Sequence, residues 1–236
     1  MKNKKILAVI PARGNSKGIK KKNIYKINGK PLIYYTIKEA KKSKFIKDLV
    51  VSTDSKEIKK ISKKYGAKVP FLRPANLATD FAPSLPVIVH AVRFMEKLKK
   101  IKYDYVIMLQ PTCPLRKYYD IDNSLKKLIK SNLDSITSIV DVGGSHPNRM
   151  KIIKNKRLYN FFEQGFEDMR PRQKLKKVYI RNGAIYISTR DTILNKKTLV
   201  GKRNLPYIMP ANRSTNIDTF KDLLEAKYFL SKRWIF

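Results

Sequence analysis

Short apolar runs alternate with longer amphipathic stretches along residues 6–142 of this chain, and this alternation constrains the fold more than any other feature. A strand that is apolar on both faces must be covered on both faces, which is typical of parallel sheets flanked by helices. The sequence therefore predicts an α/β fold with a mainly parallel central sheet, in one domain over residues 1–236. The runs lie at 6–10, 49–51, 68–72, 105–109 and 136–142, and the amphipathic stretches at 32–42, 55–65, 85–99 and 119–130.

The pattern changes after residue 142. Residues 143–177 form a basic, loop-like stretch without a helical or strand period, although it contains aromatic residues at Tyr159, Phe161, Phe162 and Phe166. Strand signals return at 178–188 and 206–209, and an amphipathic helix at 219–230 closes the chain. We therefore expect residues 143–177 to be an arm inserted into the α/β domain.

The charge balance is strongly basic, with 53 Lys and Arg against 18 Asp and Glu and a net charge of +35. A nucleic-acid-binding protein is therefore the alternative from a different functional class. Most of the basic residues, however, are lysines spread over nearly every segment, and many of these fall on the polar sides of the expected helices, as in a solvated surface. Arginine binds anions in a fixed fork, and its placement in or beside loops favours a small polyanionic substrate over a nucleic-acid partner. The loop arginines are Arg13, Arg73, Arg116, Arg149, Arg170, Arg172, Arg181 and Arg213.

Several kinds of site are excluded by composition. Cys113 is the single cysteine, so the chain cannot form an internal disulfide, and with two histidines it lacks the clusters of a structural zinc site. The apolar run at 6–10 is too short for a secretion signal, and no apolar stretch reaches the roughly 18 residues of a membrane span. We expect a cytoplasmic protein without a membrane partner.

A basic, glycine-containing loop directly follows the first expected strand. Gly14 and Gly18 allow backbone amides to approach phosphate oxygens, while Arg13, Lys17 and Lys22 supply positive charge. The loop lacks the Gly-Lys-Ser/Thr of a P-loop and the Gly-x-Gly-x-x-Gly of a dinucleotide fingerprint. It predicts a phosphate-binding loop of another kind, and an ordinary basic turn is the alternative.

This loop and five further segments resemble the signature of CMP-sialic acid synthetases, the N-acylneuraminate cytidylyltransferases. The segments occur in the order found in that family, and they extend over nearly the whole chain. They are residues 9–18 with Lys22 and Asn23, then 51–54, 71–80, 109–116, Arg172 with Gln173 and 182–186, and finally 217–219.

The resemblance implies a Rossmann-like nucleotidyltransferase fold of the GT-A-like type, with a dimerisation arm at 143–177 and a homodimeric assembly. It implies transfer of CMP from CTP to the anomeric hydroxyl of a nine-carbon 2-keto sugar acid, with release of pyrophosphate, for surface glycan biosynthesis. Mg²⁺ or Mn²⁺ is implied as cofactor, since the leaving pyrophosphate gains charge that cations must neutralise.

The resemblance also assigns nucleotide-binding and catalytic residues. Arg13, Lys22 and Asp218 match the catalytic positions, and for Gln110 a capped strand end is the alternative to substrate binding. The nucleotide-binding positions are Ala12, Arg13, Gly14, Lys17, Lys22, Asn23, Arg73, Ser84 and Gln110.

The expected metal ligands are Asp218 and Asn216. The family usually has Asp-Ile-Asp at this place, and here the first aspartate is replaced by Asn216. Positions two apart in an extended segment face the same way, so both side chains are expected to reach one Mg²⁺. Asn216 would offer a neutral carbonyl oxygen instead of a carboxylate. The alternative for Asp218 is a helix cap next to Thr219.

The sugar-binding positions implied by the resemblance lie in the arm and the following strand. They are Arg149, Arg172, Gln173, Asn182 and Tyr186. Some family members have an arginine two residues before the asparagine, where this chain has Ile180. The neighbouring Arg181 alternates to the other face of the strand, and its role, like that of His146, stays open. Arg172 or Arg149 is expected to reach into the partner's site.

The stretch at 163–173 most resembles the legionaminic acid branch of the family. Pseudaminic acid enzymes are expected to be more distant, because they lack the Asn-Gly-Ala-Ile-Tyr sequence found at 182–186. The acid expected is legionaminic or N-acylneuraminic acid. A 2-keto-3-deoxyoctonate or pseudaminate cytidylyltransferase is the alternative within the same reaction class.

Overall fold

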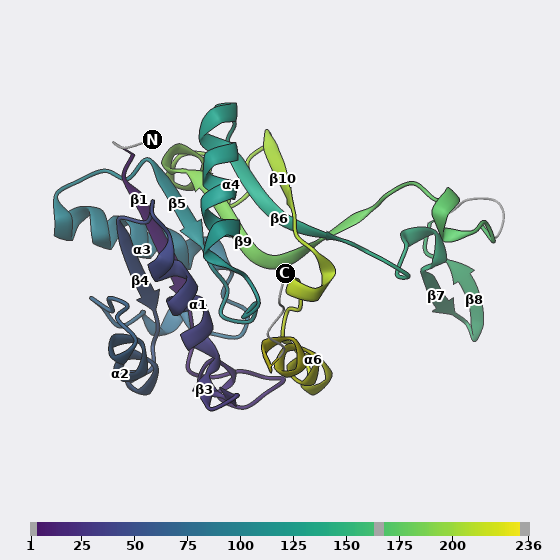
Figure 1. Ribbon diagram of the computed structural model, residues 1–236, viewed down its shortest axis with the longest axis horizontal. Helices are drawn as coiled ribbons and strands as arrows, with labels where there is room; N and C mark the ends of the chain where they lie inside the picture. Colours follow the sequence, from purple (N-terminus) through teal and green to yellow (C-terminus); the bar gives the residue numbers. More distant parts are fainter. Residues whose placement is uncertain (1–3, 163–167, 232–236) are drawn as a thin grey trace.

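The computed structural model describes residues 4–162 and 168–231, apart from the side chain of Arg172 (Figure 1). Its centre is a six-stranded sheet in the order β10-β6-β9-β5-β1-β4. β1 pairs in parallel with β4 and β5, and β10 in parallel with β6, whereas β9 runs antiparallel between β5 and β6. The mainly parallel sheet expected from the sequence is confirmed. Its strands are β1 (Ile6–Pro11), β4 (Asp48–Ser52), β5 (Tyr105–Met108), β6 (Ser135–Asp141), β9 (Tyr179–Thr189) and β10 (Asn204–Ile208).

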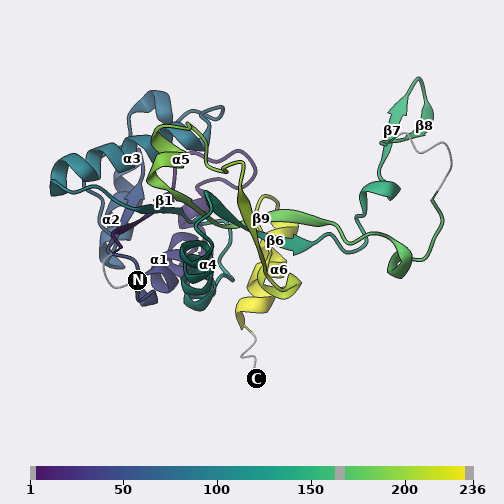
Figure 2. The same ribbon diagram turned by 90° about the horizontal axis from the view of Figure 1, so that it is seen from above.

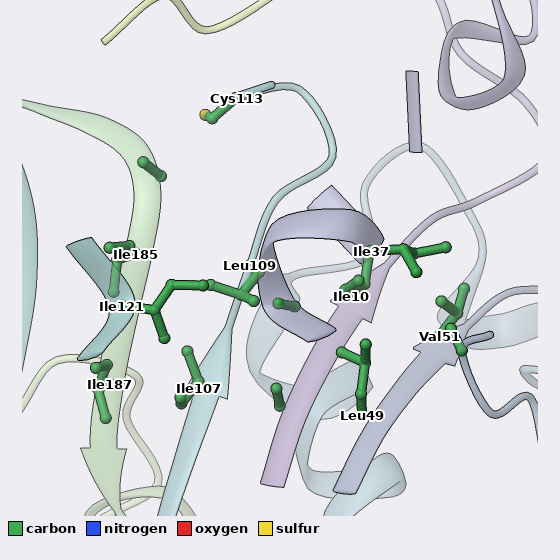
Figure 3. Packing of buried hydrophobic residues seen from close by; sticks show 14 of the residues in the cluster. Ile10, Ile37, Leu49, Val51, Ile107, Leu109, Cys113, Ile121, Ile185 and Ile187 are labelled. Carbon is green, nitrogen blue, oxygen red and sulfur yellow. The ribbon is translucent and has the colours of Figure 1, made fainter. Parts of the chain in front are cut away.

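Helices cover both faces of this sheet (Figure 2), which is why its strands are apolar on both sides. On one face, Ile37 and Ile121 pack with Ile10, Ile107 and Ile187 of the strands (Figure 3). No helix within the described ranges is long and apolar enough to cross a membrane. The face with Ile37 and Ile121 is covered by α1 (Leu32–Lys42), α2 (Lys56–Lys64) and α4 (Tyr118–Ser131). The opposite face is covered by α3 (Ser84–Lys99) and α5 (Arg190–Leu194). The last helix, α6 (Phe220–Ser231), packs beside the start of α1.

The strand expected at 68–72 does not form. In the described sheet this stretch makes only an isolated bridge, in which Lys68 pairs with Val50. Pro70 has no backbone N–H to continue a ladder. The chain turns instead toward β4, where the Arg73 amide donates to the Thr53 carbonyl at 2.7 Å.

The segment 143–177 projects from the sheet as an arm: the chain leaves along β6 and returns along β9 (Figures 1 and 2). The expectation that it contains no strand is wrong, because β7 (Lys151–Lys154) and β8 (Arg157–Asn160) pair as an antiparallel hairpin. Asn155 and Lys156 both have positive φ, as the tight turns of two-residue hairpins require. The strands are too short, and too basic at their ends, to show a clear period.

Arg116 is almost completely buried between the sheet and α1, with 1% of its surface exposed. Its guanidinium donates to the Ala184 carbonyl of β9 at 2.7 Å, to the Thr36 hydroxyl of α1 at 2.7 Å and to the Gln110 carbonyl at 3.4 Å. In the described part of the chain no carboxylate lies within ion-pairing distance of it. Neutral acceptors from three elements therefore hold the buried charge.

Replacing Thr36 tests this arrangement. Thr36→Val keeps the shape of the side chain but removes the acceptor, so we expect a loss of about 1–3 kcal/mol in the free energy of unfolding. Thr36→Ser keeps the hydroxyl and should lose clearly less. Urea unfolding followed by circular dichroism measures both values. Equal losses in the two variants would contradict a hydrogen bond to Arg116 as the cause.

Candidate active site

A cavity of about 500 Å³ opens where the loops after β1 and β5 meet residues 73–87 and the segment that carries Asp218. This is the edge at which open α/β sheets bind ligands. The cavity brings together most of the expected nucleotide-binding and catalytic residues, although they are far apart in the sequence. They are Arg13, Lys17, Lys22, Asn23, Arg73, Ser84, Gln110 and Asp218.

Each cation of the basic loop that lines this cavity lies beside a carboxylate. Arg13 Nη1 is 2.8 Å from an oxygen of Asp80, and Lys17 Nζ is 3.7 Å from the other oxygen. Lys22 Nζ donates to Asp218 at 2.9 Å and to the carbonyl of Ile217 at 2.7 Å. The Lys22 contact joins the first loop to the C-terminal part of the chain.

Arg73 provides a fourth cation at the wall of the cavity. Its side chain is buried, and its guanidinium donates to the Ser52 hydroxyl at 3.1 Å and to the Ser52 carbonyl. Burial lowers the pKa of Arg73 to about 10, against the opposing effect of Asp54. The group therefore remains charged at neutral pH and holds a positive charge at a fixed position.

Gly18 allows the basic loop to approach the C-terminal segment closely. A Cβ atom at this position would lie 2.4 Å from the carbonyl oxygen of Asp218. Two other expected residues support the loop and do not line the cavity. Ala12 is buried and its amide donates to Ser52, while the Gly14 amide donates to Asp54 Oδ1 at 2.9 Å. The Asn23 amide group fixes the loop from within, through the Arg13 carbonyl at 2.9 Å.

A second cavity of about 350 Å³ adjoins the first and shares Ser84 and Gln110 with it. Its lining includes Tyr186, Asn216 and Arg181. Gln110 thus faces both cavities, which favours a substrate role over the alternative of a strand-end cap.

The register of β9 explains how Arg181 and Tyr186 come to share this cavity. Arg181 pairs with Ile139 and Tyr186 with Thr137, so β9 has extra residues between these two pairs and is bulged there. Gly183, at the bulge, has a φ of +76°. A Cβ atom there would lie 2.5 Å from Oε1 of Gln110.

Asn182 lies outside both cavities, contrary to its expected place in the sugar pocket. It is buried, and its side-chain oxygen Oδ1 accepts from the Ser138 hydroxyl at 2.6 Å and from the Ala184 backbone amide at 3.2 Å. Its amide nitrogen donates to the Ser214 hydroxyl at 2.9 Å. These contacts commit the side chain to holding the bulge of β9. Alternation then places Arg181, and not Asn182, on the cavity side.

Asp218 presents its carboxylate to the first cavity. Its oxygens accept from Lys22 at 2.9 Å and from the side-chain amide of Asn216 at 3.2 Å. The backbone amide of Asp222, in the first turn of α6, donates to the Thr219 hydroxyl and not to Asp218. The helix-cap alternative is therefore wrong. The Asn216 carbonyl oxygen accepts from the Cys113 thiol at 3.5 Å, whose pKa burial raises to about 11.

These residues fit a divalent metal that is held largely by its substrate. Within the described residues, no group of three or more His, Cys, Asp or Glu side chains comes together. Mg²⁺ in nucleotide enzymes is commonly bound through one or two carboxylates together with substrate phosphates, and it keeps several waters. Asp218, at the edge of the cation-lined cavity, provides one such carboxylate. Asn216 turns its amide nitrogen toward Asp218 and its carbonyl oxygen toward the Cys113 thiol, so its amide group would have to rotate to offer an oxygen to the same metal.

Of the expected arm residues, Arg149 and Gln173 do not line either cavity. Gln173 lines a separate cavity of about 480 Å³ at the base of the arm, together with His146. Arg149 Nη2 donates to the carbonyl of Arg170 at 3.3 Å, and the side chain of Arg172 lies outside the described residues. His146 Nε2 lies 2.9 Å from the carbonyl of Lys176, and Nδ1 accepts from the Asn148 backbone amide. His146 therefore links the outgoing and the returning segment at the base of the arm.

The sequence interpretation missed one charged residue of the site and left another without a role. Asp80 was part of a matching segment, but nothing in its spacing indicated that it would lie on Arg13 and Lys17. The role of Arg181 was open because alternation alone does not say which face of β9 meets a cavity. In the described part of the chain, no ion pair or hydrogen bond engages its guanidinium.

Two relatives are similar in sequence to this chain over nearly its whole length. The chain is 34% identical over 227 residues to a pseudaminic acid cytidylyltransferase of Campylobacter jejuni, covering 96% of this chain and 95% of that protein. It is also 34% identical over 226 residues to a CMP-N,N'-diacetyllegionaminic acid synthase of the same organism, covering 96% and 95%. Identity thus gives no support to the expectation that the pseudaminic branch is the more distant.

The fold is also that of a solved CMP:2-keto-3-deoxy-manno-octonic acid synthetase complexed with CTP. The TM-score is 0.70 at 19% sequence identity, with 96% of this chain and 98% of that chain covered. The cytidylyltransferase family itself matches residues 7–235. On these grounds the chain belongs to the cytidylyltransferase family and is a nucleotidyltransferase.

Proposed function

We propose that this enzyme transfers CMP from CTP to the anomeric hydroxyl of a nonulosonic acid, a nine-carbon 2-keto sugar acid, and releases pyrophosphate. The observation that carries the proposal is the pair of adjoining cavities that share Ser84 and Gln110. One is lined by cations, as a triphosphate requires. The other is lined by Arg181 and Tyr186, which supply a cation and a hydroxyl for a hydroxylated carboxylic acid. The relatives named for pseudaminic and legionaminic acids support the same substrate class.

In this proposal the first cavity holds CTP with its triphosphate on Arg13, Lys17 and Lys22. Transfer of this kind depends mainly on positioning and on neutralising the charge that develops on the leaving group. Arg73 keeps its charge and its place on Ser52, so it holds the nucleotide with little reorganisation. Ser84 and Gln110 lie where the two substrates would meet.

The proposed cofactor is Mg²⁺ or Mn²⁺, held by Asp218, with Asn216 as a second donor. A bound divalent ion would neutralise phosphate charge and orient the leaving pyrophosphate. Lys22 contacts Asp218 directly, so Lys22 and a metal ion held by Asp218 would lie close enough to bind the same phosphates.

Arg181 is the group in the second cavity that we propose binds the carboxylate of the sugar acid. Its charge acts on Tyr186, whose pKa is raised by burial, with Arg181 opposing that rise. Both side chains line the second cavity. Within the nonulosonic acids, the sequence at 163–173 favours legionaminic acid; residues 163–167 of that stretch lie outside the described ones.

The arm supports a further proposal, a homodimer in which Arg172 or Arg149 reaches the partner's site. Hydrophobic side chains of the hairpin are exposed: Ile153 is 77% exposed and Leu158 is 67% exposed. Phe161 and Phe162 are also about half exposed. Such a patch is unusual on a monomer and typical of an interface.

The reaction itself is tested by pyrophosphate release from CTP with a panel of legionaminic, pseudaminic, N-acylneuraminic and 2-keto-3-deoxyoctonic acids. We expect turnover with Mg²⁺ or Mn²⁺ and none in excess chelator, because the leaving group then lacks its counter-charge. Asp218→Ala should lose about a hundredfold or more in kcat/KM, while Asn216→Asp should retain activity. Full turnover in EDTA would disprove the metal role, and no turnover with any acid of the panel would disprove the reaction.

The sugar-acid site is tested by separating the two Michaelis constants. Arg181→Ala should raise KM for the sugar acid by about tenfold or more, since a charged hydrogen bond to the carboxylate is lost, and leave KM for CTP nearly unchanged. Arg93→Ala, on the exposed face of α3, removes the same charge and is the control. If KM for CTP rises as much as KM for the acid, the assignment of Arg181 is wrong.

The dimer is tested by light scattering at micromolar concentration, where we expect twice the 27.5 kDa of one chain. Mixed dimers of Asp218→Ala and Arg172→Ala chains should recover activity that each variant lacks alone, because one of the two sites is then intact. A mass of one chain would refute the dimer. A dimer without recovery would refute only the contribution of Arg172 to the partner's site.

A further inference from the structure

Residues 79–82 contact the basic loop through charged and polar groups. Arg13 Nη1 contacts the carboxylate of Asp80 at 2.8 Å and donates to the carbonyl of Thr79 at 3.1 Å. Lys17 Nζ lies 3.7 Å from Asp80 and 4.8 Å from the ring centre of Phe81. In the described chain, the hydrogen bonds and ion pairs of residues 79–82 are with Arg13, with Lys17 and with one another.

This segment is held from one side only. Phe81 is 88% exposed, and its ring contacts the Lys17 ammonium rather than the core. Residues 79 and 80 are also exposed. Few buried contacts keep the segment in place, so it can move away from the loop at low cost when its ionic contacts are replaced.

Asp80 binds its cations in the manner of a phosphate group. Its two oxygens contact two different cations, Arg13 and Lys17, as two oxygens of one phosphate would. Both cations line the cavity proposed for the triphosphate, and so does Asp80 itself. A phosphate that took these two cations would have to displace the carboxylate or lie beside it, and like charges at such distances repel.

We propose that Asp80 is an internal counter-anion, which neutralises Arg13 and Lys17 when no phosphate is bound, yields them to the triphosphate and takes them back as pyrophosphate leaves. The inference rests on the proposed function, since it needs a triphosphate in this cavity. Asp80 then lowers the affinity of the site for CTP and for pyrophosphate alike, and it limits inhibition by the product.

The experiment is calorimetric titration of the full-length protein with pyrophosphate, and separately with CTP, both in the presence of Mg²⁺. Asp80→Asn keeps the size of the side chain and removes its charge. We expect it to bind pyrophosphate about three- to tenfold more tightly than the unchanged protein, and the gain should shrink as salt is added. The inhibition constant of pyrophosphate in the turnover assay should fall by the same factor. Structural damage would weaken binding, so a gain in affinity is specific to the proposed role.

Two further variants serve as controls. Glu57→Gln removes the same charge from a pair that Glu57 forms with Lys21 of the same loop at 2.8 Å, outside the residues that line the cavity. It should leave pyrophosphate binding unchanged. Asp80→Glu restores the carboxylate, so its affinity should lie near that of the unchanged protein.

The possible results separate this inference from the function on which it rests. Unchanged or weaker pyrophosphate binding in Asp80→Asn would overturn the role of Asp80. Equal gains in Asp80→Asn and Glu57→Gln would also overturn it, because the overall positive field would then be responsible. If the unchanged protein binds neither CTP nor pyrophosphate, the proposed triphosphate site is itself wrong.

Discussion

The buried guanidinium of Arg116 is the interaction on which the rest of the structure depends. Burial lowers its pKa, and the charge is held by acceptors from α1, from the loop after β5 and from β9. A buried cation without such partners would be costly. Because the loop that carries Gln110 and the strand that carries Tyr186 are tied to the same group, the two cavities have a common, fixed wall.

Close approach of backbone segments completes the site. The basic loop can lie against the C-terminal segment because Gly18 has no side chain, and β9 can pass Gln110 because Gly183 has none. Lys22 and Asp218, from opposite ends of the chain, consequently meet at one cavity. The site is therefore a product of packing between distant segments, and a side chain added at either glycine would collide with the segment that it packs against.

Electrostatics inside the cleft differ from those of the surface. Many lysines of the chain lie on exposed positions of the helices, where water and salt screen them. Within the first cavity, by contrast, each cation of the loop lies beside a carboxylate, Asp80 for both Arg13 and Lys17 and Asp218 for Lys22. In our proposal, phosphate binding there is an exchange of anions among cations at set positions, which the net charge of +35 does not describe.

The sequence by itself determined the α/β class and most strands and helices, because apolar periodicity is a local feature. The clustering of Arg13, Lys22 and Gln110 was indicated by the resemblance to the family, and the three residues do line one cavity. Only the tertiary structure decided that β9 is antiparallel, that residues 151–160 form a hairpin, and that the strand expected at 68–72 is absent. The tertiary structure also decided which side chains of β9 enter the core and which line the second cavity. It decided as well that Arg13 pairs with the carboxylate of Asp80. Each of these features depends on contact with a residue distant in the chain or on a shift of strand register. Distant contacts and register shifts leave no periodic signal in the sequence.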